Sequence, residues 1–266
     1  METENSYIEY FKVHGMWNRI DLEWNDIRND VNILVGINGG GKTTLMNLIA
    51  DYYVGKKPKK VAGLTMEGNP VGSPVTYLRS FDIPANSRKK TESLLLQDLK
   101  FVINQNGEGS SFFDYRMRML NYPEEALQIQ ERISKFFRIV DSLFAETNKS
   151  VAIDPQTNTL VFHFRKTIKG SSVDHSIEEQ IRLDQLSSGE KQILLILTTV
   201  FLQNEQPCVL LMDEPEISLH ISWQDRLISM IRELNPNCQL ILTTHSPNIF
   251  ADGWEDKIVF IEDLIR

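Results

Sequence analysis

The spacing of hydrophobic residues predicts a β-rich beginning to this chain. Apolar and polar residues alternate over residues 7–13 and again over residues 19–24, as they do in half-buried antiparallel strands. Residues 31–35 form a short apolar run that ends at Gly36, and residues 45–53 then have helical spacing. The pattern therefore predicts three strands, a glycine-rich turn and a helix, in that order.

The middle of the chain is predicted to contain one clear helix. Residues 55–75 are rich in Lys, Gly and Pro and are expected to form a loop, followed by a strand over residues 75–83. Residues 92–104 fit more than one kind of element. From Pro123 to about residue 145, apolar residues recur at steps of three and four, which predicts an amphipathic helix.

The remainder of the chain alternates between strands and helices. Two β runs, 151–153 and 160–164, flank a polar turn and predict a hairpin. After it, the pattern predicts helix, strand, helix, strand and strand over residues 193–202, 209–212, 222–234, 239–243 and 258–261. This order indicates an α/β fold, with a mostly parallel central sheet covered by helices.

Length and composition favour one cytoplasmic domain. The 266 residues suit a single domain over 1–266, with a core lobe of about 1–84 and 190–266 and an inserted lobe of about 85–189. No apolar stretch reaches the roughly 18 residues of a membrane span, and the acidic N-terminus lacks the pattern of a secretory signal. Cys208 and Cys238 lie far apart without a CxxC, which indicates neither a disulfide framework nor a zinc site.

The net charge of −8 argues against a chain that coats nucleic acid nonspecifically. The charge is unevenly distributed, because residues 51–100 carry nine Lys and Arg against five Asp and Glu. The densest basic clusters are residues 56–60 and 88–90. They are either solvated loops or contacts for a phosphate backbone, and both interpretations stay open.

A phosphate-binding loop is the strongest single motif. Residues 36–43 read G-I-N-G-G-G-K-T, a match to GxxxxGK[ST] between a predicted strand and a predicted helix. Glycines let successive backbone N–H groups point at phosphate oxygens, and the helix N-terminus adds partial positive charge. Lys42 is expected to reach the β- and γ-phosphates, and the Thr43 hydroxyl to ligate Mg²⁺. The predicted nucleotide-binding residues here are Gly36, Asn38, Gly39, Gly40, Gly41, Lys42, Thr43 and Thr44.

A second motif supplies two adjacent acids. Residues 208–212 form a buried apolar run that delivers Asp213 and Glu214 to its end. Asp213 can hold Mg²⁺, and Glu214 can polarise an attacking water. A strand that merely ends in solvated acids is the alternative, and the upstream phosphate-binding loop argues against it.

Residues 186–190, L-S-S-G-E, open the predicted helix before this strand. By itself, Ser187 with Glu190 three positions later is a helix-capping pattern. In company with the other motifs, the segment resembles the signature of the ATP-binding-cassette ATPases, which lies between the two Walker motifs as here. Residues 216–220 and T-T-H-S-P at 243–247 resemble the family's D-loop and its switch-histidine segment.

The resemblance implies a P-loop NTPase of the ABC type, with an antiparallel N-terminal β-subdomain and a helical inserted lobe. It also implies a homodimer in which two modules close head to tail around two ATP molecules. Ser187 and Gly189 would contact the γ-phosphate held by the neighbouring copy, and His245, at the position of the switch histidine, would approach the γ-phosphate. The signature departs from the family's LSGGQ pattern at Ser188 and Glu190.

Two family features find no single counterpart. Gln97 and Gln105 both lie at tolerable distances for the glutamine loop, and the choice between them stays open. For the residue that stacks on adenine, Trp17 and Tyr10 are both candidates.

The helix after the signature and the D-loop are similar to the RecF/SMC/OLD side of the superfamily, whose members act on DNA ends, recombination intermediates or in phage defence. About 140 residues separate Thr44 from Leu186, which leaves no room for a coiled-coil arm, and the 53 residues after Asp213 leave none for a fused nuclease. We therefore expect an ATPase that acts through a separate nuclease or toxin, with nucleic acid as a possible partner. A transporter ATPase subunit and a non-catalytic scaffold are the alternatives; a membrane partner would favour the first.

Overall fold

The computed structural model describes residues 5–55, 63–79, 92–104, 111–157, 159–168 and 175–266. The chain divides into two compact units. The first contains residues 1–82 and 205–266, and the second contains residues 83–204. The expected lobe boundaries near residues 84 and 190 stay a prediction.

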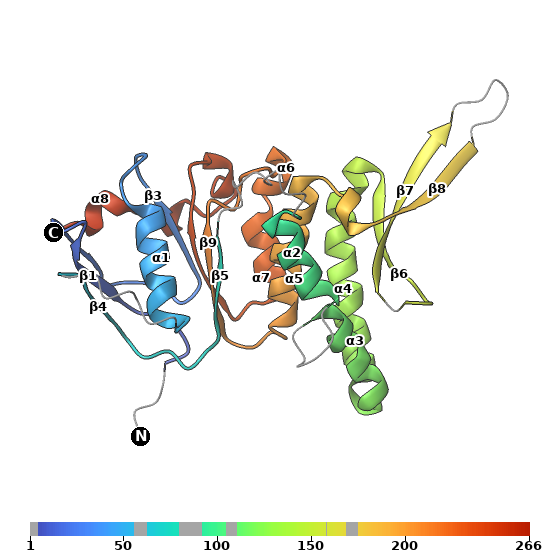
Figure 1. Ribbon diagram of the computed structural model, residues 1–266, viewed down its shortest axis with the longest axis horizontal. Coiled ribbons are helices and arrows are strands. Elements are labelled where there is room, and N and C mark those ends of the chain that lie inside the picture. The colour runs from blue at the N-terminus through green and yellow to red at the C-terminus, as the bar shows by residue number, and fades with distance from the viewer. Residues whose placement is uncertain (1–4, 56–62, 80–91, 105–110, 158, 169–174) are drawn as a thin grey trace. The chain divides into compact units, whose positions relative to one another are not determined.

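The first unit is built on a five-stranded sheet with the order β11-β3-β10-β9-β5, in which all neighbours are parallel (Figure 1). Its strands in chain order are β3 (Val31–Val35), β5 (Val75–Leu78), β9 (Cys208–Asp213), β10 (Cys238–Thr243) and β11 (Ile258–Phe260). Thr243 is in register with Leu34 on one side and with Asp213 on the other. The carboxyl ends of β3, β10 and β9 therefore meet at one edge, where α/β proteins place their ligands.

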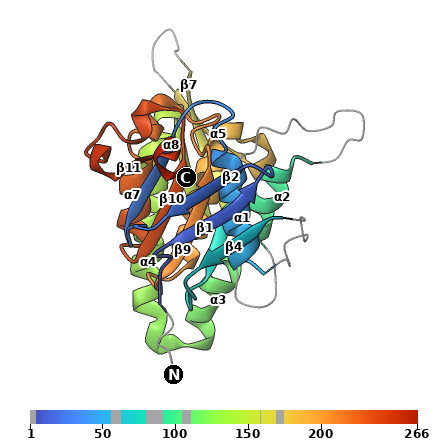
Figure 2. The same cartoon turned by 90° about the vertical axis from the view of Figure 1, so that its left-hand side faces the viewer.

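The same unit also contains a smaller, antiparallel sheet. It has the order β2-β1-β4 and consists of β1 (Phe11–Met16), β2 (Ile20–Trp24) and β4 (Thr65–Gly68) (Figure 2). The helix α1 (Lys42–Tyr53) contributes Leu45, Met46 and Ile49 to a core shared with both sheets. Burial of apolar surface from three elements in one core is the main force that fixes the start of α1 beside the sheet edge.

Short helices complete the first unit. The single helix expected over residues 222–234 is two helices, α6 (Ile221–Gln224) and α7 (Leu227–Leu234). The expected last strand ends at Phe260, and α8 (Ile261–Leu264) follows directly. Cys208 and Cys238 are register partners on β9 and β10, with buried, free thiols.

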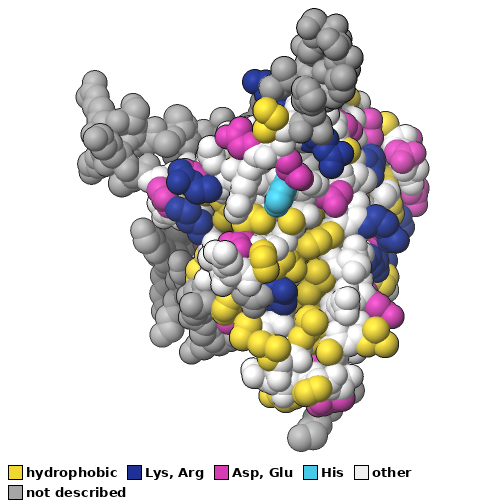
Figure 3. Space-filling view, turned by 90° about the vertical axis from the view of Figure 1, so that its right-hand side faces the viewer, with side chains coloured by type: hydrophobic (Ala, Val, Ile, Leu, Met, Phe, Trp, Pro, Cys, Tyr) yellow, Lys and Arg dark blue, Asp and Glu magenta, His cyan; other side chains and the backbone are white. Residues whose placement is uncertain are grey.

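The second unit combines helices with a three-stranded antiparallel sheet. Its elements are α2 (Leu94–Asn104), α3 (Phe112–Asn121), α4 (Ala126–Phe144), β6 (Lys149–Ile153), β7 (Leu160–Ile168), β8 (His175–Ile181) and α5 (Ser188–Leu202). The sheet order is β6-β7-β8. The helix α4 contacts β6, and Asp141 on α4 accepts the backbone N–H of Val151 at 2.7 Å. Figure 3 views the face of this unit that carries the three strands, where hydrophobic side chains gather between charged ones.

The α/β fold expected from the sequence is confirmed, with three local corrections. The segment 55–75, expected to be a loop, contains β4, because its short strand is recruited by pairing with β1. The strand β8 was not foreseen, since its charged sequence lacks a clear alternation. The helix α3 was also missed, whereas the ambiguous residues 92–104 contain the helix α2. Among the described residues, no helix has the length and apolar character needed to cross a membrane.

Candidate nucleotide-binding site

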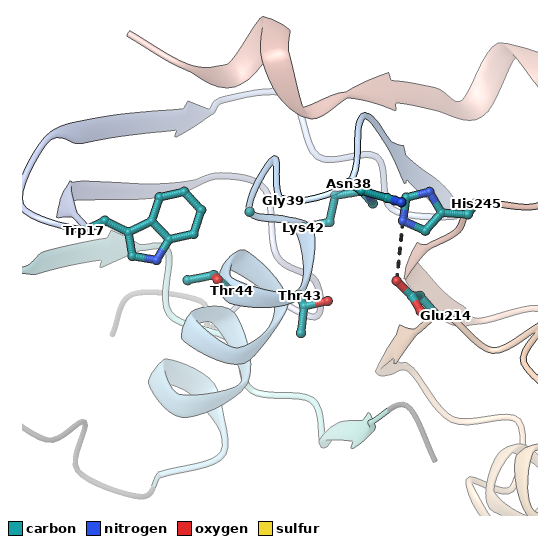
Figure 4. Close-up of a pocket in the computed structure, with 9 residues that line it drawn as sticks. Trp17, Asn38, Gly39, Lys42, Thr43, Thr44, Glu214 and His245 are labelled. Atoms are coloured by element: carbon teal, nitrogen blue, oxygen red, sulfur yellow. Dashed lines mark ion pairs between the residues drawn. The ribbon is translucent and has the colours of Figure 1, made fainter. Parts of the chain in front are cut away.

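A pocket of about 650 Å³ opens at the carboxyl edge of the five-stranded sheet (Figure 4). It draws residues from the β1–β2 turn, the loop after β3, the start of α1, the end of β9 and the segment after β10. They are Trp17, Asn38, Gly39, Gly41, Lys42, Thr43, Thr44, Glu214 and His245. The fold thus brings together segments that lie up to about 230 residues apart in the chain.

The loop after β3 requires glycine at two positions, where φ is positive and a Cβ would meet a neighbouring side chain. Gly41 has φ +99°, and a Cβ there would lie 3.1 Å from the Trp17 ring. Gly36 has φ +153°, and a Cβ there would lie 2.6 Å from the Ile261 side chain. Positive φ values are costly for residues with a Cβ, so only glycine lets the backbone curl this tightly. Such a curled, glycine-rich backbone fits a phosphate group.

Lys42 begins α1 and is buried, with 5% of its surface exposed. Its ammonium group donates to the carbonyl oxygens of Gly36 and Ile37, at 2.9 and 3.1 Å. Within the part of the chain that the structure describes, no side chain caps the N-terminus of α1, and the first N–H groups of a helix need an acceptor outside the helix. A helix N-terminus next to a lysine ammonium group is suited to bind an anion.

Asp213 lies at the centre of a hydroxyl cluster. Its Oδ1 accepts hydrogen bonds from the Thr43 hydroxyl at 3.1 Å and from the Thr243 hydroxyl at 2.7 Å. The side chain is 3% exposed. An oxygen set made of a carboxylate and a threonine hydroxyl matches the preference of Mg²⁺, so these residues fit that ion. Among the described residues, no cluster of three or more His, Cys, Asp or Glu side chains could hold a metal.

Glu214 and His245 face each other across the pocket. His245 Nε2 lies 3.5 Å from Glu214 Oε1 (Figure 4). Glu214 has φ +49°, and its backbone N–H is held by the Thr243 hydroxyl at 3.0 Å. Burial and the negative charge of Asp213 raise the pKa of Glu214, while His245 and Lys42 oppose them. A carboxylate with a raised pKa that lines a pocket is suited to accept a proton.

The signature segment belongs to the second unit. Ser187 is the N-cap residue of α5, and the capping box with Glu190 that its sequence predicts is formed. Gly189 is buried in the first turn of the same helix. The capping interpretation is therefore correct as local structure, and a phosphate contact by Ser187 and Gly189 stays a prediction.

The structure bears differently on the candidates for the adenine-stacking residue and for the glutamine loop. Trp17 lines the pocket, whereas Tyr10 is not among its lining residues. Gln97 lies on α2, where its amide donates to the Glu92 carbonyl at 2.9 Å, and Gln105 lies outside the described residues. The basic clusters 56–60 and 88–90 also lie outside the described residues.

Three supporting residues were not singled out for a role by the sequence. Thr243 holds both Asp213 and Glu214, as described above. Glu262 accepts the backbone N–H of Ile37 at 3.0 Å and so anchors the glycine-rich loop after β3. Glu216 contacts the segment that carries His245. Their contacts depend on which strand ends are neighbours, and no local motif reports that.

The parallel sheet, the glycine loop before α1 and the acids at the end of β9 define a P-loop NTPase domain, and the proteins that it resembles place it in the ABC-type group of the RecF/SMC/OLD-like kind. A family model described as "AAA domain, putative AbiEii toxin, Type IV TA system" matches residues 85–252. The chain belongs to this family.

Two curated relatives are similar to much of the chain. "Retron Vc95 probable ATPase" from Vibrio cholerae serotype O1 biovar El Tor is 25% identical over 201 residues, covering 71% of this chain and 33% of that protein. "Septu protein PtuA" from Bacillus thuringiensis is 24% identical over 184 residues, covering 61% of this chain and 42% of that protein. The matched parts thus span less than half the length of these relatives.

A solved structure has the same fold. It is described as "Crystal structure of the SmcHead bound to the C-winged helix domain of ScpA". The TM-score is 0.55 at 13% identity, and the alignment covers 96% of this chain and 93% of that one. At this identity the similarity concerns the fold alone.

Proposed function

We propose that this chain is an ATP-hydrolysing module whose two copies close head to tail around ATP. The observation that carries the proposal is the convergence of Lys42, Thr43, Glu214 and His245 on one pocket, with the Asp213 carboxylate hydrogen-bonded to Thr43. Phosphate binding, metal binding and proton acceptance each have a group of the right chemistry there.

In this mechanism the chain's own residues position the triphosphate and the attacking water. The backbone N–H groups of the glycine loop and the Lys42 ammonium group bind the phosphate oxygens and stabilise the charge that develops on them. Thr43 and Asp213 would hold Mg²⁺, which when bound adds positive charge next to the phosphates. Glu214 accepts a proton from the attacking water, and His245 orients the γ-phosphate.

The signature of a second copy completes the site. The Ser187 hydroxyl and the Gly189 backbone N–H donate hydrogen bonds to the γ-phosphate held by the neighbouring copy. These charge-assisted bonds form with ATP and are lost with ADP, so ATP favours the closed dimer and hydrolysis reopens it. Whether ATP or ADP is bound thereby determines whether the two copies are closed together or apart.

The closed dimer would act as a sensor or motor in anti-phage defence or DNA maintenance, through a separate effector such as a nuclease or toxin. Kinship with proteins named as a retron ATPase and a Septu protein supports the defence role. The family description, with its toxin and toxin–antitoxin terms, supports an effector partner.

Glu214→Gln tests the proposal. Removing the proton acceptor is expected to lower ATP turnover on the order of 10²- to 10⁴-fold and to let a closed dimer accumulate with ATP. Light scattering measures the dimer, and phosphate release measures turnover. A chain that stays monomeric with ATP would contradict the dimer. Hydrolysis that Glu214→Gln abolishes would exclude a scaffold in which ATP is only structural.

Lys42→Ala tests ATP binding, just as Glu214→Gln tests hydrolysis. Because the ammonium group is expected to bind the β- and γ-phosphates, this variant should lose ATP affinity and form no dimer. ATP binding that remains as tight as in the unaltered chain would reject the phosphate-binding role of the loop.

A further inference from the structure

Glu190 is an ionisable group within the signature turn, at a position where the related pattern has an uncharged glutamine. Its side chain is 1% exposed. Its Oε2 accepts the backbone N–H of Ser187 at 2.8 Å, and its own N–H donates to Ser187 Oγ at 3.2 Å. The turn that presents Ser187 is thus held on both sides by Glu190.

The other carboxylate oxygen of Glu190 has two donors, one from the first residue of β6 and one from the turn before it. Lys149 Nζ lies 2.7 Å from Glu190 Oε1, and the Thr147 hydroxyl donates to the same oxygen at 2.9 Å. The Lys149 side chain is only 17% exposed, so the ion pair is well shielded from water. Shielded pairs interact more strongly than surface pairs, and removing one partner leaves the other charge uncompensated.

The charge state of Glu190 follows from these contacts. Burial alone would raise the pKa of Glu190, but the hydrogen bonds from Lys149, Ser187 and Thr147 outweigh it and hold the pKa below its ordinary value. Glu190 is therefore ionised at neutral pH. A full negative charge therefore lies in the same helical turn as the Ser187 hydroxyl, whose oxygen accepts from Glu190 N–H.

A negative charge at this place conflicts with phosphate binding. Two like charges less than a nanometre apart inside a protein repel strongly enough to change an affinity tenfold or more. The positive end of α5 offsets part of this repulsion, because the helix N-terminus attracts anions. Lys149 is placed to offset the rest, since its ammonium group contacts the carboxylate directly.

We propose that Lys149 is a positioning residue for the signature: it neutralises Glu190, so that the Ser187 turn accepts the γ-phosphate of ATP bound to a second copy of the chain. The inference rests on the ATP-dependent dimer proposed above. It adds a residue from β6 to the closure step and gives the ion pair a role beyond local stability.

A double-mutant cycle in the Glu214→Gln chain tests the inference. The variants are Lys149→Met, Glu190→Gln and their combination, and Lys166→Met on β7 is the control because it is an exposed lysine of the same sheet. Light scattering gives the ATP concentration for half-maximal dimer, and thermal unfolding confirms that each variant folds. Lys149→Met should raise that concentration tenfold or more. The double variant should return to within about threefold of the Glu214→Gln chain, because a neutral glutamine needs no cation and still accepts the Ser187 N–H.

The outcomes separate the two proposals. A Glu214→Gln chain that does not dimerise with ATP rejects the proposed function. A dimerising Glu214→Gln chain that is unaffected by Lys149→Met overturns this inference alone, as does a folded double variant impaired like Lys149→Met. If Lys149→Met does not fold, the double variant decides: normal ATP-dependent dimerisation supports the inference. Failure of the double variant to fold or to dimerise shows that the pair is structural and overturns it.

Discussion

The Glu216 carboxylate accepts the backbone N–H of His245 at 2.8 Å, although the two residues lie on different segments at the sheet edge. The same oxygen, Oε1, accepts the Thr244 hydroxyl at 2.8 Å. Glu216 follows β9 by three residues, and His245 follows β10 by two. The position of the histidine is therefore set by a carboxylate from the neighbouring strand's loop.

This relationship predicts that Glu216 acts on turnover through His245. Glu216→Ala removes the acceptor of both bonds and should lower kcat on the order of tenfold or more, with little change in KM, since hydrogen bonds to a charged group contribute about 1.5–3 kcal/mol. Glu216→Gln keeps an acceptor oxygen and should lose less. Steady-state ATPase kinetics measure both, and Glu255→Ala is the control because Glu255 is an exposed acid of the same unit. An unchanged kcat in Glu216→Ala would show that turnover does not depend on the hydrogen bond between Glu216 and His245.

Asp213→Asn should weaken the dependence of the reaction on its metal. The amide keeps an oxygen for the Thr43 and Thr243 hydroxyls but loses the charge that attracts Mg²⁺. We expect the MgCl₂ concentration for half-maximal hydrolysis to rise at least about tenfold. An ATPase titration with MgCl₂ checks this, with Asp252→Asn as the exposed control. The same magnesium dependence in Asp213→Asn and Asp252→Asn would show that Asp213 does not bind the metal.

As the pH is lowered, the rate of hydrolysis should begin to fall at a higher pH than it would if the proton acceptor had the pKa of an ordinary glutamate. Burial and the charge of Asp213 raise the pKa of Glu214, which favours its protonated form. A protonated Glu214 cannot accept a proton from water, so activity is lost as the pH falls through this raised pKa. A pH profile of kcat/KM measures it. In Asp213→Asn, assayed at saturating Mg²⁺, the acid limb of the profile should move to lower pH. An acid limb that does not move would mean that a group other than Glu214 causes it.

Gly41→Ala should impair ATP binding as well as stability. Gly41 has φ +99°, and Gly55, a residue outside the pocket, has φ +79°. Alanine in this region costs about 1–2 kcal/mol at either position. Only at Gly41 would the new Cβ also crowd the Trp17 ring, 3.1 Å away, next to the phosphate-binding loop. Thermal unfolding and an ATP titration of both variants test this. Equal loss of ATP affinity in Gly55→Ala would show a global effect instead.

The sequence predicted which motif residues the fold brings together better than it predicted the elements around them. Motif residues such as Lys42, Thr43 and Asp213 were identified because their spacing is fixed by local geometry: a tight turn before a helix, and an acid at a strand end. The strands β4 and β8 were missed because each is stabilised by its neighbour, β1 or β7, rather than by its own pattern.

By itself, the sequence determined the α/β fold class, the glycine-rich loop before α1 and the family to which the chain belongs, since these follow from periodicity and from short motifs. Only the tertiary structure decided the partners of those motifs. Thr243 joins Asp213 to Glu214, Glu216 holds His245, and Lys149 forms an ion pair with Glu190. The physical reason is that hydrogen bonds and ion pairs depend on distances of about 3 Å, and the packing of strands and helices, not chain order, sets those distances.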